Sequence, residues 1–170
     1  TSPLPTYLIA FAVGPFDIVD GKILGKIPLR GITPKGLGKK IAYALQETPH
    51  ILKILENYFQ IPYPYSKLDL IAVPDFAAGA MENAGAITFR ESLLLFDPKT
   101  APIQQVRHFA EVTAHELAHQ WFGNLVTLKW WEDIWLNEAF ATWMAEKTIL
   151  EYKPGYHVEW DELVGTQHAM

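Results

Sequence analysis

Two histidines, His115 and His119, stand four residues apart in a segment whose apolar side chains recur at helical spacing. The helix that this spacing predicts covers residues 101–122 and ends at a Gly-Asn pair, a common helix stop. Positions i and i+4 of an α-helix lie about 40° apart around the axis and one turn along it. Both imidazoles can therefore point at one metal ion, and neutral imidazole suits Zn²⁺. Glu116 is displaced around the axis, where its carboxylate can reach a water on the metal and act as general base.

Glu138 is the candidate for a third ligand, with eighteen residues between it and His119. That length allows one helix to end and another to begin, and Asp133 is predicted to cap a second helix that runs to about Tyr152. Two histidines and a glutamate with an open fourth position form a catalytic zinc set. The neighbours of Glu138 are apolar, so a buried carboxylate at this position would need a partner such as a metal ion.

Two interpretations without a metal stay open for these residues. The histidines can be ordinary core or surface side chains that share a helix face, because the motif alone also arises by chance. Glu138 can be a surface glutamate on an amphipathic helix. The presence of a third ligand of the right type at a workable spacing favours the metal site.

The rest of the chain predicts an α+β fold with an open sheet. A helix is predicted over residues 36–60, where Pro49 indicates either a kink or two abutting helices. Residues 7–14 are predicted to form a buried strand, and the Asp20-Gly21 pair that follows is a hairpin signal. Further extended segments are predicted at residues 26–33, 67–74 and 86–96.

Composition narrows the classes of function. The chain has no cysteine, which excludes disulfides and thiolate ligands and leaves His, Asp and Glu as the strong metal ligands. The net charge is -5 and the Lys and Arg residues are scattered, so no nucleic-acid partner is expected. No apolar run is long enough for a membrane segment and no signal peptide is visible, which weakly favours a cytoplasmic location. Four tryptophans are expected in the core: Trp130, Trp131, Trp135 and Trp143.

A second motif, Gly-Ala-Met-Glu-Asn, lies 31 residues before the first histidine of the pair. Together the two motifs resemble the gluzincin zinc aminopeptidases, the family of aminopeptidase N and leukotriene A hydrolase, in both order and spacing. The resemblance implies a truncated thermolysin-like zinc peptidase catalytic domain with one Zn²⁺ ion held by His115, His119 and Glu138. It also implies that residues 1–20 end the family's N-terminal β-domain and linker, and that residues 21–170 begin the catalytic domain.

The resemblance implies a role for each residue of the second motif. Glu82 would bind the free α-amine of a peptide, since a carboxylate holds an ammonium ion by a charge-assisted hydrogen bond. The motif as a whole would lie along the extended substrate, and it consists of Gly79, Ala80, Met81, Glu82 and Asn83. The implied activity is hydrolysis of the N-terminal peptide bond of peptides, with water activated by the metal and Glu116.

One feature of the family pattern, a tyrosine that stabilises the transition state, has no counterpart among these 170 residues. The family's transition-state tyrosine lies downstream of the second helix, beyond Met170, and we expect the 170 residues alone to be inactive. The expected partners are therefore peptide substrates and the remaining domains of a parent protein. The alternatives are an endopeptidase or epoxide hydrolase with the same zinc set, and a non-catalytic, zinc-stabilised binding or scaffold module. The carboxylate at Glu82 argues against an endopeptidase, and the intact Glu116 argues against a scaffold.

Overall fold

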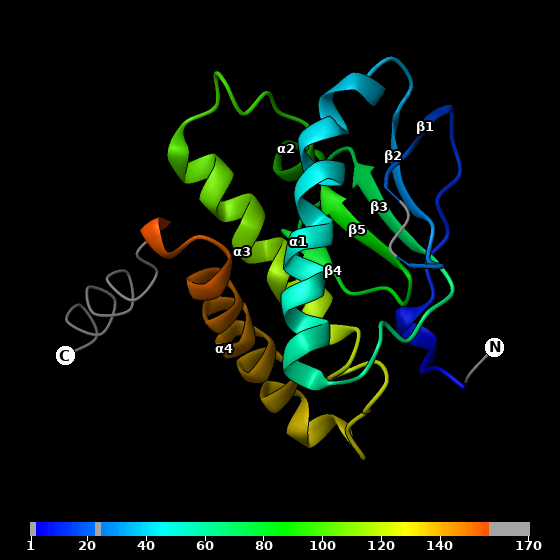
Figure 1. The fold of residues 1–170 in the computed structure, drawn as a ribbon. Coiled ribbons are helices and arrows are strands. Elements are labelled where there is room, and N and C mark those ends of the chain that lie inside the picture. Colours follow the sequence, from blue (N-terminus) through cyan, green and yellow to red (C-terminus); the bar gives the residue numbers. More distant parts are fainter. Residues whose placement is uncertain (1–2, 23–24, 157–170) are drawn as a thin grey trace.

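The computed structural model describes residues 3–22 and 25–156, which form one mixed sheet and a set of packed helices (Figure 1). Within these residues the strand order is β1-β2-β3-β5-β4. The strands are β1 Phe16–Asp20, β2 Leu29–Pro34, β3 Leu68–Val73, β4 Ala80–Met81 and β5 Ala86–Arg90. The α-helices are α1 Ala42–Phe59, α2 Glu91–Leu94, α3 Ile103–His119 and α4 Ile134–Tyr152. The expected α+β class is confirmed.

The centre of the sheet is parallel and its edges are antiparallel. β1 and β2 form a hairpin, β2 pairs with β3 and β3 with β5 in parallel, and the short β4 runs antiparallel to β5. β3 is buried along nearly its whole length, as expected for a central parallel strand. The core beside it combines strand and helix residues, among them Leu70, Ile87 and Phe89 from the sheet and Leu55, Phe109 and Leu117 from α1 and α3.

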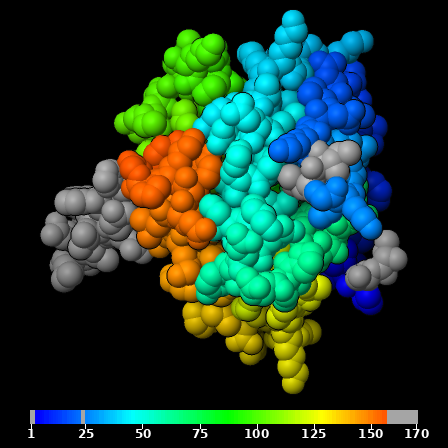
Figure 2. Space-filling view, in the orientation of Figure 1, coloured from blue at the N-terminus to red at the C-terminus, as the bar shows by residue number. Residues whose placement is uncertain are grey.

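The helices α1, α3 and α4 contact one another (Figure 1), and α3 and α4 carry the predicted metal ligands. Figure 2 shows the end of α4, in orange, lying against α1, in cyan, while the segment between α3 and α4, in yellow, protrudes at one end. Pro49 lies inside a single helix, α1, so the alternative of two abutting helices is wrong. No helix among residues 3–22 and 25–156 is long and apolar enough to cross a membrane.

The expected strand at residues 7–14 is wrong. Thr6–Leu8 form a turn of 3-10 helix, and the residues that follow are irregular, with Phe11 90% and Val13 94% exposed. The hairpin does form, but its first strand is β1, which lies later in the chain and pairs with β2. The apolar run precedes the sheet edge, and among residues 3–22 and 25–156 no strand pairs with it and no layer covers Phe11 or Val13.

Two other predictions are corrected. The extended segment expected at residues 86–96 ends at Arg90, where β5 gives way to α2, because Leu93 and Leu94 are both buried as in a helix rather than alternating. The tryptophans are not core residues: Trp130, Trp131, Trp135 and Trp143 are 66%, 58%, 65% and 48% exposed. α4 is apolar around most of its circumference, and the described neighbours cover only the side that carries Ala141, Met144 and Ala145.

Both long helices of the second half lie close to their predicted positions. α3 ends at His119, a few residues before the Gly-Asn pair, and Gly123 has a φ of +117° that favours glycine. α4 begins directly after Asp133, but the side chain of Asp133 makes no capping hydrogen bond. The predicted start of this helix is therefore confirmed, but the predicted capping hydrogen bond from the Asp133 side chain is wrong.

Candidate metal centre

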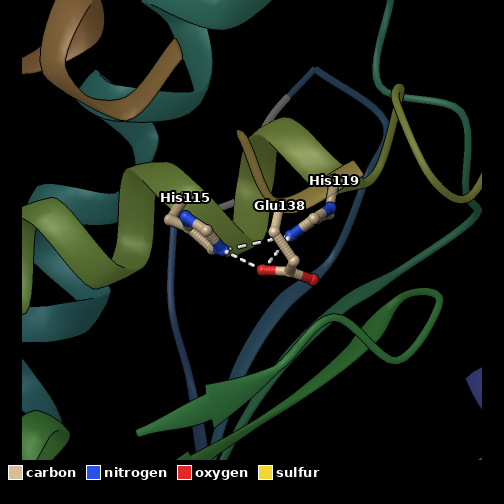
Figure 3. Close-up of side chains that lie close together, drawn as sticks. All are labelled: His115, His119 and Glu138. Carbon is tan, nitrogen blue, oxygen red and sulfur yellow. Dashed lines mark hydrogen bonds and ion pairs between the residues drawn. The ribbon is translucent and has the colours of Figure 1, made fainter. Parts of the chain in front are cut away.

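His115, His119 and Glu138 bring three ligand atoms together between α3 and α4 (Figure 3). The Nε2 atoms of the two histidines are 3.0 Å apart. Glu138 Oε2 lies 3.2 Å from Nε2 of His115 and 3.7 Å from Nε2 of His119. The two helices thus place atoms from three side chains at the corners of one small triangle.

This triangle has the dimensions of a tetrahedral zinc site. Zinc–nitrogen and zinc–oxygen bonds of about 2.0–2.2 Å place neighbouring tetrahedral ligands roughly 3.3 Å apart. Two neutral imidazoles with nitrogen atoms 3.0 Å apart also require a shared proton or cation, since two lone pairs facing each other repel. The donor set of two imidazoles and one carboxylate leaves a fourth tetrahedral position for water or substrate. The residues present therefore fit Zn²⁺.

The other nitrogen atom of each imidazole has a partner that fixes the ring. Nδ1 of His119 lies 3.2 Å from the carbonyl oxygen of Phe122, which can only accept, so Nδ1 carries the proton and Nε2 is free to bind a metal. Nδ1 of His115 lies 3.4 Å from the hydroxyl of Thr142. Sequence reasoning did not find these partners, although Thr142 lies one helical turn after Glu138 and so shares its face of α4.

Glu138 is more exposed than its apolar neighbours in the sequence suggested. Its side chain is 56% exposed, so the expectation of a buried carboxylate is wrong. The imidazoles of His115 and then His119 beside it lower the pKa of Glu138 well below its usual range. The carboxylate is therefore ionised at neutral pH and supplies one negative charge to the cluster.

Glu116 points into a different environment from Glu138. It is 6% exposed, and its Oε2 atom is buried without a hydrogen-bond partner in the described part of the chain. Burial raises the pKa of Glu116 to about 8, against a lowering by His119. A cation held by the neighbouring ligands would lower this pKa toward neutrality. A carboxyl group with a pKa near 7 can both take and return a proton.

A cavity of about 620 Å³ lies directly beside these ligands. His115, Glu116 and Glu138 form part of its wall, and Gly79 and Ala80 of the second motif form another part. The remaining lining comes from α3 and α4: His108, Glu111, Val112, Thr142, Ala145 and Glu146. The two sequence motifs, far apart in the chain, therefore border one space of a size typical for small ligands.

The comparisons with known proteins identify the family. Residues 43–170 match the model of the peptidase family M1 domain, three quarters of the chain. The chain belongs to peptidase family M1. It is 48% identical over 168 residues to a leucyl aminopeptidase of Saccharolobus solfataricus, covering 98% of the chain and 21% of that protein. It is 45% identical to aminopeptidase M1-C of Oryza sativa, covering 99% and 19%, and 50% identical to endoplasmic reticulum aminopeptidase 2 of Bos taurus, covering 85% and 15%. The chain spans about a fifth of the length of these M1 relatives.

The second motif of this M1 chain is built into the sheet. Ala80 and Met81 form β4, which hydrogen-bonds to β5, and Glu82 and Asn83 follow at 7% and 6% exposed. The Oδ1 atom of Asn83 accepts a hydrogen bond of 3.0 Å from the hydroxyl of Thr88. The charge of Glu82 raises the pKa values of both Glu116 and His119, so its carboxylate lies within electrostatic range of the metal ligands.

Tyr7 is a further residue near the M1 site that sequence reasoning missed. Burial raises the pKa of its hydroxyl, and the carboxylates of Glu82 and Glu138 raise it further, so the hydroxyl lies close to both charges. Its ring centroid is 5.4 Å from that of Trp131. The short 3-10 helix that carries Tyr7 is held beside the end of the second motif, because the N–H of Ala84, the next residue after Asn83, donates to the carbonyl of Leu8 at 3.3 Å. No spacing in the sequence connects residue 7 with residue 82.

Proposed function

We propose that this chain carries the active site of a zinc-dependent aminopeptidase that hydrolyses the N-terminal peptide bond of peptides. The triangle of His115, His119 and Glu138, with the unpartnered carboxylate of Glu116 beside it, is the observation that carries this proposal. The relatives named aminopeptidases at 45–50% identity support it. The chain corresponds to a fifth of their length, so the proposal concerns the whole protein that contains it.

Zinc bound by the three ligands would polarise the scissile carbonyl and make the attacking water more acidic. Glu116 would take one proton from that water as its oxygen bonds to the carbonyl carbon. The carbon–nitrogen bond then breaks, and Glu116 returns the proton to the leaving nitrogen, so that the free carboxyl and the shortened peptide are formed. The burial of Glu116 suits this exchange because water does not compete for its proton.

Glu82 would bind the ammonium group of the substrate's first residue. A carboxylate that is 93% buried near the metal ligands provides a strong, poorly solvated partner for that charge. Gly79 and Ala80, which border the cavity, would let the peptide backbone lie along the edge strand β4. Met81 and Asn83 complete the motif, Asn83 through its hydrogen bond to Thr88. A peptide substrate that is anchored by its terminal amine can present only its first peptide bond to the metal.

The remaining expectations from the resemblance stay predictions. These are a thermolysin-like catalytic domain, a boundary that assigns residues 1–20 to a preceding β-domain and 21–170 to the catalytic domain, and inactivity of the 170 residues alone. A zinc-stabilised scaffold is the alternative function of another class. It is supported less well, because a structural site has four protein ligands and no base, whereas this cluster offers three ligands, and His115, Glu138 and Glu116 border an open cavity.

The test is Glu116→Gln in the full-length protein that contains this chain, with hydrolysis of aminoacyl-arylamides and zinc content measured together. We expect zinc to stay bound and turnover to fall at least about a hundredfold, the usual contribution of a general base. Glu151→Gln is the matched control, since Glu151 is an exposed glutamate near the far end of α4. Unchanged turnover in Glu116→Gln would refute the assigned mechanism.

A further inference from the structure

Two amide side chains within the five residues after the predicted metal ligand His119 hold the main chain of the loop that carries Glu82. The carbonyl oxygen of Glu82 accepts hydrogen bonds from Nε2 of Gln120 at 3.1 Å and from Nδ2 of Asn124 at 2.8 Å. At the other end of the loop, the N–H of Gly85 donates to Oε1 of Gln120 at 3.1 Å. Gln120 and Asn124 are 0% and 2% exposed, so these bonds are shielded from water.

The same short segment is tied to the metal ligand. Gln120 is the next residue after His119, and the N–H of Asn124 donates to the carbonyl of His119 at 3.1 Å. Nε2 of Gln120 also lies 3.3 Å from the carbonyl of Glu116. The side chain of Gln120 therefore links the main chain of Glu82 to that of Glu116, and Gln120 is itself bonded covalently to His119. Buried hydrogen bonds in a low-dielectric interior hold such geometry firmly.

Other contacts keep the loop folded without reference to the metal. Thr88 holds the side chain of Asn83, and the carbonyl of Gly85 accepts from the N–H of Asp69 at 3.1 Å and from Nζ of Lys67 at 3.0 Å. Gly85 itself has a φ of +68°, and a Cβ there would lie 3.0 Å from the carbonyl of Lys67. The sheet thus fixes the shape of the loop, while Gln120 and Asn124 fix its position relative to His119.

We propose that Gln120 and Asn124 are positioning residues that set the separation between the Glu82 carboxylate and the metal ligands, and thereby determine the preference of the site for a free terminal amine. The inference rests on the proposed function, because it assigns the amine to Glu82. It adds that the preference depends on two neutral amides that touch neither the metal nor the substrate. If this loop shifted by a fraction of an ångström, His115, His119 and Glu138 would still bind zinc, but Glu82 would hold the amine poorly.

The experiment uses the zinc-loaded full-length protein and two inhibitors, leucine hydroxamate and its desamino analogue 4-methylpentanohydroxamate. Both bind the metal through the hydroxamate. The inhibition constant of the desamino analogue divided by that of leucine hydroxamate therefore measures how strongly the site binds the amine. Gln120→Met keeps the volume of the side chain and removes both of its hydrogen-bonding ends. We expect it to reduce the ratio on the order of tenfold while zinc content stays at one ion per chain.

A double-mutant cycle with Glu82→Ala separates positioning from a general structural effect. If Gln120 acts through Glu82, the second substitution changes the ratio far less in Gln120→Met than in the wild type. An unchanged ratio in Gln120→Met, or effects that simply multiply, would overturn the inference. Asn124→Ser, a milder change at the same carbonyl, carries the same test if Gln120→Met does not fold. Thr48→Val is the matched control, because it removes a buried hydrogen bond on α1 far from the loop.

Failure of the proposed function gives a different result. If the wild-type protein binds zinc but both hydroxamates inhibit it equally, the amine-binding role of Glu82 itself is refuted. A wild-type protein with a clear amine preference, unchanged in Gln120→Met and in Asn124→Ser, would leave that role intact and refute only the positioning.

Discussion

The Nε2 atoms of His115 and His119 lie 3.0 Å apart, and the carboxylate of Glu138 closes the triangle from a different helix. Two imidazoles and a carboxylate at this separation repel or compete for protons unless a cation lies between them. Metal binding should therefore stabilise the fold as well as supply chemistry, since it selects the arrangement in which α3 and α4 are packed together.

Removal of the metal is the first test of this coupling. Dialysis of the full-length protein against a zinc chelator should abolish hydrolysis of aminoacyl-arylamides and lower the Tm, because a ligand that binds only the folded state stabilises it by mass action. An excess of zinc at about a hundred times its Kd should restore about 2.7 kcal/mol of unfolding free energy. The measurement is differential scanning calorimetry with and without added Zn²⁺. A Tm that is insensitive to the metal would contradict the coupling.

Thr142→Val tests the partner of His115. The substitution preserves the shape of the side chain but removes the hydroxyl 3.4 Å from Nδ1, so the imidazole loses its orientation and its zinc affinity should fall about tenfold. Zinc affinity is measured by competition with a chromogenic chelator. Thr148→Val is the control on the same helix, since its hydroxyl donates to the carbonyl of Met144. Equal affinities in the two variants would remove the assigned role of Thr142.

Gly123→Ala tests how the start of α4 is placed. A Cβ at Gly123 would lie 2.4 Å from Oδ1 of Asn137, and its φ of +117° is strained for any other residue. Asn137 directly precedes Glu138, so the clash should cost more than about 2 kcal/mol of unfolding free energy and weaken zinc binding as well. Chemical denaturation gives the first quantity. At Gly155 a Cβ would meet no atom of the described residues within 4 Å, so Gly155→Ala should change stability by less than about 0.5 kcal/mol.

The ion-paired carboxylate of Asp69 should make the stability of the fold depend on pH in acid. Burial works to raise its pKa, but hydrogen bonds from Arg30 and Lys67 outweigh burial, so the folded pKa lies below the ordinary value. The carboxylate therefore stabilises the fold above about pH 3.9, and this stabilisation is lost as the pH falls below that value. Asp69→Asn should destabilise the protein at pH 7 by roughly 1 kcal/mol, since both cations are partly exposed, and should flatten the pH dependence below pH 4. Denaturation curves at pH 7 and pH 3 that shift equally in both proteins would contradict this.

The cluster of His115, His119 and Glu138 was predictable because the signals for it are local. The helical repeat places His115 and His119 on one face, and the number of residues before Glu138 allows only a short connection to the second helix. The same reasoning placed the starts and ends of α3 and α4 within a few residues. Which side of each helix or strand is covered could not be predicted, because burial depends on segments that are distant in the chain.

The errors follow from that gap. Residues 7–14 have the composition of a strand, but no strand in the described part of the chain pairs with them. The tryptophans around α4 have the composition of a core, but the described part of the chain covers only one side of that helix. Gln120, Asn124 and Tyr7 gave no signal because their interactions with residues 82–85 span 35 residues or more and depend on amide and hydroxyl groups with no characteristic spacing.

The most direct test of the account is anomalous diffraction at the zinc absorption edge from crystals of the full-length protein. We expect one peak, about 2.0–2.2 Å from Nε2 of His115, Nε2 of His119 and a carboxylate oxygen of Glu138, with Glu116 beside it but not bound to it. A peak bound to Glu116 in place of Glu138, or no peak between the two histidines in zinc-supplemented crystals, would contradict it.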